Sequence, residues 1–356
     1  MWKLIFLIIC AKSIIQCAAH SSDSTNGSKT DPCTFSNPVA GGADPWVFEK
    51  DGTYYFSESG GGGVQLSSSE NMTEIKSNSR QVWRQPATGW NASNLWAPEL
   101  HFIQDRWYIY YTAGESGPPF IHQRAGVLRA VTGNPLGEYE DMGMLYTGDD
   151  IETGQKVKWA IDLTVLELDD QLYAVWSGWE ENADTDRTPQ HLYIAEMENP
   201  WTISSNRVII SSPEEPWETG TELAINEGPQ ILKNGEDVFI IYSASESWLV
   251  AYNLGLLRLE SPDADPLDPD SWTKEGSVFQ GAGNVYGAGH ASFTRSPDGS
   301  ENWIAYHTKR SPDPGWGRNI HMQPFTWKED GLPDFGTPVQ PGEVLDMPSG
   351  SCLKKE

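Results

Sequence analysis

The fold is decided by a short stretch near the start of the chain, ADPWVF at residues 43–48, followed by GTYYF at residues 52–56. The two runs carry β-branched and aromatic residues, which favour strands, and the intervening Asp51-Gly52 is a tight-turn signal. The stretch therefore predicts a β-hairpin. It begins beside Asp44, a residue that can hold or exchange a proton.

The same unit recurs four more times along the chain. Each copy has a turn signal between two apolar runs, and each begins with an ionisable residue. These lead residues are about 55 to 65 positions apart, a spacing suited to four-stranded blades with long loops. The lead residues are Asp44, Glu99, Asp162, Glu227 and His290, and the later turn signals are Asp105-Arg106, Asp169-Asp170, Asn234-Gly235 and Asp298-Gly299.

Further strands complete each repeat. A third apolar run follows every hairpin, for example at residues 64–66 and 126–130, and a fourth is visible at 81–83 and 207–210. A single four-stranded sheet is a poor free-standing fold, so the repeated sheets must pack face to face around an axis. We therefore predict an all-β, five-bladed β-propeller whose lead residues converge on the central channel.

The composition limits the classes of partner. The 356 residues include 16 Trp, 13 Tyr and 11 Phe although only 38% are hydrophobic, so aromatic side chains supply much of the core. The formal net charge of −26 repels nucleic acids and anionic membranes and suits a neutral or cationic partner. We expect no nucleic-acid or membrane partner, and we expect a monomer.

The N-terminal region is typical of an exported protein. Residues 1–19 combine Lys3 with a short, interrupted apolar run and small residues, which predicts a secretory signal peptide rather than a membrane span. Residues 20–37 predict a flexible leader and residues 38–352 the propeller. The protein is therefore expected to be secreted and extracellular.

Export bears on the cysteines and on glycosylation. Signal cleavage leaves Cys33 and Cys352 near the two ends of the domain, and we predict a disulfide between them, with two free thiols as the alternative. Asn-x-Ser/Thr sequons at Asn26, Asn71 and Asn91 predict glycosylation in a source that glycosylates.

Converging carboxylates suit the cleavage of glycosidic bonds. That reaction needs a protonated acid at the leaving oxygen and an ionised carboxylate, and two carboxyls held in one channel push each other's pKa apart. The alternative is calcium binding or hydrogen bonding at strand ends, since such networks also gather acids. Three carboxylates with Trp46, Trp96 and Trp179 near them in sequence favour catalysis. These residues alone do not say which carboxylate is the acid.

The same segments resemble the signature segments of glycoside hydrolase family 43. Within that family the chain is most similar to exo-acting α-L-arabinofuranosidases that attack α-1,5-arabinan. The resemblance is carried by ADPW at 43–46, WAPELH at 96–101, IDL at 161–163, NEGP at 226–229, GHASF at 289–293, and by residues 192–201 and 322–325.

This resemblance implies a five-bladed propeller and an inverting hydrolase, with roles carried over residue by residue. Asp44 matches the general base that activates water, Glu227 the general acid, and Asp162 the third carboxylate, which orients the acid and raises its pKa. The chemistry then requires no cofactor. The implied substrate is plant cell-wall arabinan or arabinoxylan.

Other positions carry assignments with an open alternative. His290 matches a histidine near a metal on the channel axis, often calcium, but calcium prefers oxygen ligands, so a structural histidine is the alternative. Arg318 resembles an arginine that contacts sugar hydroxyls, and the alternative is an exposed charge on the surface. Trp46 and Trp96 are expected either to stack on a sugar or to pack between blades, and Glu99 to line the cavity.

Three activities fit this pattern. The main prediction is an exo-acting arabinofuranosidase, and the second is a β-xylosidase or endo-arabinanase of the same family. The third is a propeller that binds glycans without cleaving them. A binder has no need for Asp44, Asp162 and Glu227 in one channel, which argues against the third.

Overall fold

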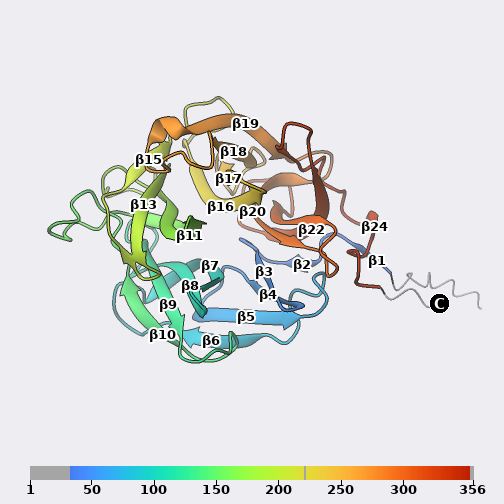
Figure 1. Cartoon of the computed structure of the whole chain (residues 1–356), viewed down its shortest axis with the longest axis horizontal. Coiled ribbons are helices and arrows are strands. Elements are labelled where there is room, and N and C mark those ends of the chain that lie inside the picture. Colours follow the sequence, from blue (N-terminus) through green and yellow to red (C-terminus); the bar gives the residue numbers. More distant parts are fainter. Residues whose placement is uncertain (1–32, 220–221, 353–356) are drawn as a thin grey trace, which may run out of the picture. The chain divides into compact units, whose positions relative to one another are not determined.

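The computed structural model describes residues 33–219 and 222–352. These residues form five antiparallel blade sheets arranged around a central axis and one separate two-stranded sheet, and this part of the chain contains no α-helix (Figure 1). A single 3₁₀ turn, η1 (Pro269–Ser271), lies within the described ranges. The predicted all-β, five-bladed β-propeller is confirmed.

The first strand of each blade lies nearest the axis and the later strands follow outward (Figure 1). Blade 1 comprises β3 (Trp46–Lys50), β4 (Thr53–Ser57), β5 (Gly63–Ser69) and β6 (Arg80–Arg84). Blade 2 comprises β7 (Ser93–Ile103), β8 (Arg106–Gly114), β9 (Arg124–Ala130) and β10 (Tyr139–Met144). Blade 3 comprises β11 (Ala160–Leu168), β12 (Gln171–Gly178), β13 (His191–Asn199), β14 (Thr202–Ile203) and β15 (Val208–Ser211). Blade 4 comprises β16 (Asn226–Asn234), β17 (Asp237–Ala244), β18 (Asn253–Leu259) and β19 (Trp272–Gln280).

Blade 5 closes the ring with strands from both ends of the chain. It comprises β20 (Tyr286–Arg295), β21 (Asn302–Lys309) and β22 (Arg318–Trp327), with β2 (Ala40–Gly41) and β23 (Pro333–Asp334) both paired to β22. Beside it, β1 (Thr34–Ser36) pairs with β24 (Val344–Asp346). The leader predicted for residues 20–37 is therefore too long, because residues 34–36 form a strand and the compact unit begins at Cys33.

The inner hairpins follow from their turn residues. Both residues of the two-residue turn have positive φ at Asp51-Gly52, Gln104-Asp105 and Asp169-Asp170, as a primed turn requires. The second turn lies one residue earlier than the predicted Asp105-Arg106, because Ile103 pairs with Arg106. In blade 4, Asn234 pairs with Asp237, which moves that turn one residue later than predicted.

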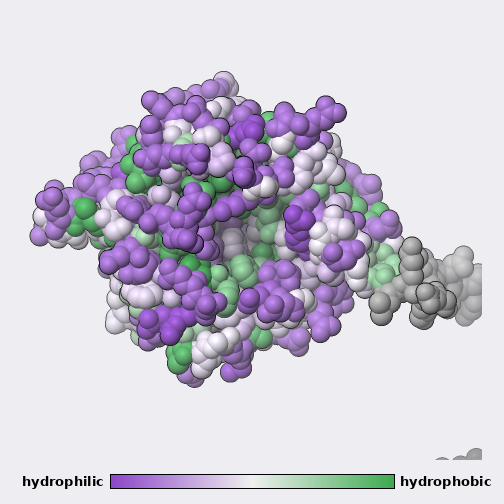
Figure 2. All heavy atoms as spheres, viewed as in Figure 1, coloured by the Kyte–Doolittle hydropathy of each residue, from purple (hydrophilic) through white to green (hydrophobic). Residues whose placement is uncertain are grey.

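The blades bury one another face to face. Five clusters of buried apolar side chains lie at the five blade-to-blade boundaries, and each draws residues from two adjacent blades. Between blades 2 and 3, for example, Tyr110 and Val127 pack with Leu163 and Trp176. This arrangement leaves the inner strands facing the axis, and the face in Figure 2 is hollowed at its centre within a largely hydrophilic rim.

The structure describes only some of the residues on which the predictions related to export depend. The signal peptide of residues 1–19 and the sequon at Asn26 lie outside the described residues. The pairing of β1 with β24 brings the regions of Cys33 and Cys352 together, and the disulfide stays a prediction. The sequon at Asn71 is partly exposed, whereas the Asn91 amide is buried and donates to Tyr111 and Asp141, which argues against a glycan on Asn91. No helix in the described ranges is long and apolar enough to span a membrane.

Candidate active site

A cavity of about 590 Å³ opens on the central channel. All five blades and their loops contribute to its wall, so it lies where the innermost strands converge. The predicted site residues in its lining are Asp44, Trp96, Asp162, Glu227, His290 and Arg318, and the walls also include Phe120, Trp159, Ser247, Trp248 and Trp316.

The inner strands share a backbone feature where they enter the cavity. One residue per blade adopts a left-handed conformation with φ between 40° and 55°, a region that non-glycine residues enter at a cost. In blades 2 to 5 the strand pairing also shifts register there, as in a β-bulge, which re-aims the side chains next to it. The five residues are Asp44, Ala97, Asp162, Gly228 and His290.

Side chains of neighbouring blades hold these residues in place. A buried N–H without a partner is costly, and each of the five N–H groups finds a side-chain acceptor. The acceptors are Ser59 Oγ for Ala97 (2.7 Å), Thr112 Oγ1 for Asp162 (3.0 Å), Asp162 Oδ2 for Gly228 (3.0 Å), Ser243 Oγ for His290 (2.8 Å) and His307 Nδ1 for Asp44 (3.1 Å).

This register corrects one prediction from the sequence. The five lead residues do not occupy equivalent positions: Asp44, Asp162 and His290 do, whereas Glu227 precedes the left-handed residue of blade 4 by one position. Glu99 follows the left-handed residue of blade 2 by two positions. Glu99 is absent from the cavity lining given above, whereas Glu227 is part of it.

Asp44 is surrounded by nitrogen atoms of blade 5. Its Oδ1 lies 3.2 Å from His307 Nδ1, 3.4 Å from His290 Nδ1 and 3.4 Å from Arg318 Nη1. Ser59 Oγ donates to Oδ2. Burial raises the pKa of Asp44, but the neighbouring His290, His307 and Arg318 outweigh burial and hold it well below its usual value.

The two histidines beside Asp44 are neutral near pH 7. Burial lowers the pKa of His290, and it lowers that of His307 to about 3, with the Arg318 charge adding to the effect on His307. The permanent positive charge at Asp44 is therefore the Arg318 guanidinium, whose other terminal nitrogen donates to Ser247 Oγ at 3.1 Å. Asp44 is therefore ionised at neutral pH.

Glu227 has the opposite electrostatic environment. Burial raises its pKa to about 7, while a hydrogen bond from the Tyr252 hydroxyl to Oε1 (2.9 Å) and the Arg318 charge act to lower it. The nearby Asp44 charge acts in the same direction as burial and is part of that net value. Glu227 therefore keeps its proton up to neutral pH, in the same cavity as an ionised carboxylate.

Asp162 stands beside Glu227. Burial raises the pKa of Asp162 well above its usual value, and the charges of Glu227 and Asp44 add to that effect. Its Oδ2 accepts the N–H of Gly228, the residue that follows Glu227. Asp162 thus fixes the backbone next to Glu227, and the two carboxyls oppose each other's ionisation.

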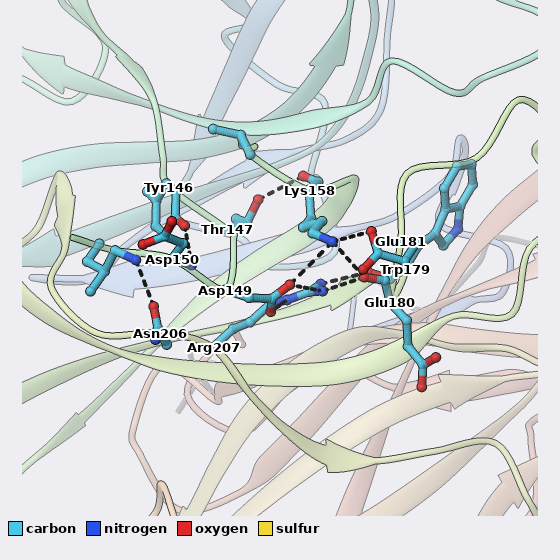
Figure 3. Close-up of polar contacts among 12 residues, drawn as sticks. Tyr146, Thr147, Asp149, Asp150, Lys158, Trp179, Glu180, Glu181, Asn206 and Arg207 are labelled. Carbon is cyan, nitrogen blue, oxygen red and sulfur yellow. Dashed lines mark hydrogen bonds and ion pairs between the residues drawn. The ribbon is translucent and has the colours of Figure 1, made fainter. Parts of the chain in front are cut away.

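A network of charges joins Arg207, Asp149 and Lys158 to the segment around Trp179 (Figure 3). Arg207 donates to both oxygens of Asp149 (2.6 and 3.1 Å) and to the carbonyls of Trp179 and Glu180 (2.7 Å each). Lys158 contacts Asp149 (3.3 Å) and Glu181 (2.5 Å).

This network fixes a tryptophan of the cavity wall. Trp179 is fully buried and its ring stacks on Trp159 at 4.2 Å with an interplanar angle of 3°. Trp159 lines the cavity, and its indole N–H donates to the carbonyl of Phe120 (2.7 Å). Trp96 meets Phe120 edge to face at 5.0 Å. Blades 2 and 3 therefore present an ordered aromatic wall.

Comparisons with known proteins place this geometry in a family. The family model described as "Glycosyl hydrolases family 43" matches residues 35–333. The chain belongs to glycosyl hydrolase family 43. The family predicted from the sequence is thereby confirmed.

Several family-43 relatives carry a named activity. An extracellular exo-α-(1->5)-L-arabinofuranosidase of Streptomyces avermitilis is 35% identical over 87% of this chain, and α-L-arabinofuranosidase 43 of Humicola insolens is 34% identical over 84%. The chain spans 64% and 62% of the length of these two relatives. The crystal structure of an α-L-arabinofuranosidase from Lactobacillus brevis is 31% identical, with a TM-score of 0.78 over 87% of this chain and 98% of that one.

Two predicted residues lie elsewhere in this family-43 propeller. The indole N–H of Trp46 donates to the carbonyl of Leu100 (2.8 Å), and its ring stacks on His101 at 4.7 Å. Glu99 is buried and bonds to His101 and to Gln230 of blade 4. Trp46, His101 and Gln230 line a separate hollow of about 330 Å³. The structure thus places Trp46 and Glu99 apart from the three carboxylates.

The residues near His290 do not fit a metal held by the protein. Calcium takes six to eight oxygen ligands, and no group of three or more His, Cys, Asp and Glu side chains in the described ranges converges as metal ligands would. His290 instead contacts Asp44 and lies against Gly228. We assign no chemical step to a metal, and calcium near His290 stays an untested prediction.

Several cavity residues were missed from the sequence. Trp159 stands three positions before Asp162, as Trp96 stands three before Glu99, and this parallel was a usable signal. Tyr252, which bonds to Glu227, and the pair Trp248 and Trp316 lie outside the repeated hairpins. Their approach to the cavity depends on loop conformations that no local pattern specifies.

Proposed function

We propose that this protein is a secreted, inverting, exo-acting α-L-arabinofuranosidase that releases single arabinose units from α-1,5-arabinan, arabino-oligosaccharides or arabinoxylan. The observation that carries the proposal is the divergence of two carboxyl pKa values in one cavity, low at Asp44 and about 7 at Glu227. Such a divergence supplies an acid and a base at a single pH. The names of the relatives support the choice of sugar.

In the proposed reaction the proton movements are divided between two blades. Glu227 gives its proton to the glycosidic oxygen as the bond to the anomeric carbon breaks. Asp44 takes a proton from water, whose oxygen attacks the same carbon from the opposite face. Asp162 holds the Gly228 N–H and, by its proximity, disfavours the ionisation of Glu227. The sugar product leaves with inverted configuration.

Ordered positioning supports this chemistry. Arg318 contacts Asp44 and Ser247, so it can present its remaining N–H groups near the substrate hydroxyls. The wall formed by Trp96, Phe120 and Trp159 closes one side of the cavity. A cavity closed on one side favours removal of terminal units, and an extracellular relative together with the predicted signal peptide at residues 1–19 supports secretion.

The test is a product analysis of the purified protein. It would be incubated separately with an aryl α-L-arabinofuranoside, an aryl β-xyloside and linear arabinan. We expect free arabinose as the early product from arabinan with little loss of viscosity, activity on the arabinofuranoside, and little on the xyloside. A rapid fall in viscosity with mixed oligosaccharides would contradict exo action, and preference for the xyloside would contradict the choice of sugar.

A further inference from the structure

Two tryptophans, Trp248 and Trp316, form an aromatic surface in the cavity lining. Trp316 is 63% exposed, whereas most aromatic residues of the described chain are at least partly buried. Its ring lies 5.1 Å from that of Trp248, and both residues line the cavity. The Arg318 guanidinium lies 5.0 Å from the ring of Trp316. An exposed indole at the edge of a polar cavity is a ready platform for the C–H face of a sugar.

A buried cation holds this surface in a fixed position. Lys309 is 4% exposed, and its Nζ donates to the carbonyls of Trp248 (2.7 Å) and Gly315 (2.9 Å). The N–H of Gly315 also donates to the carbonyl of Trp248 (3.0 Å), so the two loops are joined directly. The indole of Trp316 is therefore presented by a cross-linked pair of loops, which lowers the entropy lost when a ligand binds.

The location of the pair identifies the part of the substrate that it would meet. Trp248 lies in the loop that follows β17 of blade 4, the blade that carries Glu227. Trp316 lies in the loop between β21 and β22 of the adjacent blade 5. In an inverting displacement the water and the leaving group stand on opposite sides of the anomeric carbon. The leaving sugar must contact the acid, so it extends over the side of Glu227 rather than over that of Asp44 in blade 1.

We propose that Trp248 and Trp316 bind the sugar unit on the leaving side of the scissile bond, a neutral arabinofuranose ring in the substrate class proposed above. This inference rests on the proposed function, because it uses Glu227 as the acid to set the direction of the chain. It makes Trp316 a residue that selects oligosaccharides over simple glycosides. A neutral ring also suits a protein whose net charge of −26 disfavours acidic ligands.

The experiment compares two substrates that differ only on the leaving side. Methyl α-L-arabinofuranoside offers no leaving sugar, whereas α-1,5-arabinobiose offers one ring. We expect Trp316→Ala to lower the ratio of kcat/KM for arabinobiose to that for the methyl glycoside about tenfold, as the loss of about 1.4 kcal/mol of stacking would. Trp316→Phe, which keeps an aromatic ring, should restore most of that ratio.

Trp201→Ala is the matched control. The Arg129 guanidinium lies 5.2 Å from the ring of Trp201, as Arg318 does with Trp316, but Trp201 packs between blades 2 and 3 and is not among the cavity residues. It should leave the substrate ratio unchanged. Equal losses on both substrates in Trp316→Ala would overturn the proposal and assign Trp316 to the support of Arg318, and no loss would overturn it as well. Wild-type protein inactive on both arabinofuranosides would refute the proposed function, and the binding site with it.

Discussion

Replacing Tyr252 by Phe isolates the hydrogen bond that the ionised Glu227 receives. The hydroxyl donates to Glu227 Oε1 at 2.9 Å, and the ring stacks on His307 at 7°, so Phe keeps the packing. Burial raises the pKa of Glu227 to about 7, and this bond acts against burial. A hydrogen bond to a charged group is worth about 1.5–3 kcal/mol, and about 1.4 kcal/mol corresponds to one pKa unit. Glu227 in Tyr252→Phe should therefore keep its proton to about one to two pH units higher.

The assay is the pH dependence of kcat/KM on arabinobiose, which reports the free enzyme. Glu227 is competent as an acid only when protonated, so activity falls as the pH rises through its pKa, and the alkaline limb of the profile should move to higher pH in Tyr252→Phe. Tyr306→Phe is the control, because that buried hydroxyl donates to Gln323 (2.8 Å) outside the cavity lining. An alkaline limb that stays in place or moves to lower pH in Tyr252→Phe would refute the reasoning.

Three further perturbations test the site and its wall. Glu227→Gln should lower kcat on arabinobiose about 10²- to 10⁴-fold. It should lower kcat much less on a dinitrophenyl arabinofuranoside, because that leaving group needs no proton. Equal small losses of kcat on both substrates would remove Glu227 from the acid role. Asp44→Asn should lose activity on both substrates, and proton NMR of early wild-type product should show the inverted anomer, with a retained anomer contradicting the role of Asp44 as base. Arg207→Lys keeps the charge but not the fork that bonds to Asp149 and two carbonyls, so KM for arabinotriose should rise about fivefold with little change in kcat. Arg258→Lys, which alters a single and more exposed contact to Asp237 on blade 4, should leave KM unchanged. Identical KM effects in both variants would dismiss the Arg207 network as a positioning device.

The blade count could be predicted from the sequence because a hairpin is a local structure. The turn Asp51-Gly52 and the alternating run after it predict a strand, a turn and a second strand within about a dozen residues. When such a hairpin recurs five times, only a few architectures can bury every sheet. The closing strand β2 escaped prediction because two residues, Ala40–Gly41, carry no periodic signal and gain their structure only from β22, some 280 positions away.

The candidate site was predicted in its carboxylates but not in its walls. Asp162 and Glu227 lie in the repeated inner strands and Asp44 stands just before one, so their convergence follows from the repeat. Trp159 lines the cavity with the support of the loop at Trp179, which Arg207 holds by its hydrogen bonds. Arg207 also bonds to Asp149, 58 positions earlier in the chain. Contacts of that range leave no pattern in a single sequence.

The register of the innermost strands separates residues that look alike in sequence. Glu99 and Glu227 both lie in the innermost strand of their blade, yet Glu227 precedes its left-handed residue and Glu99 follows its own. Glu227 consequently lines the cavity beside Asp162, whereas Glu99 bonds to His101 and Gln230. A displacement of a few residues along the strand thus decides between a candidate acid and a residue of the channel interior.

The difference between the two candidate catalytic carboxyls originates in the closure of the ring. Asp44 lies three residues after the end of β2, and β2 pairs with β22, whose first residue is Arg318. The N–H of Gly42 donates to the carbonyl of Arg318 (3.2 Å), which brings Asp44 beside the guanidinium and the two histidines of blade 5. Glu227 lies in the middle of the chain, and its one side-chain hydrogen bond in the described ranges comes from Tyr252, a neutral donor. The strand that closes the propeller therefore also places a permanent positive charge beside the candidate base, Asp44. The candidate acid, Glu227, has no positive charge bonded to it in the described part of the chain, and this difference holds the two pKa values apart.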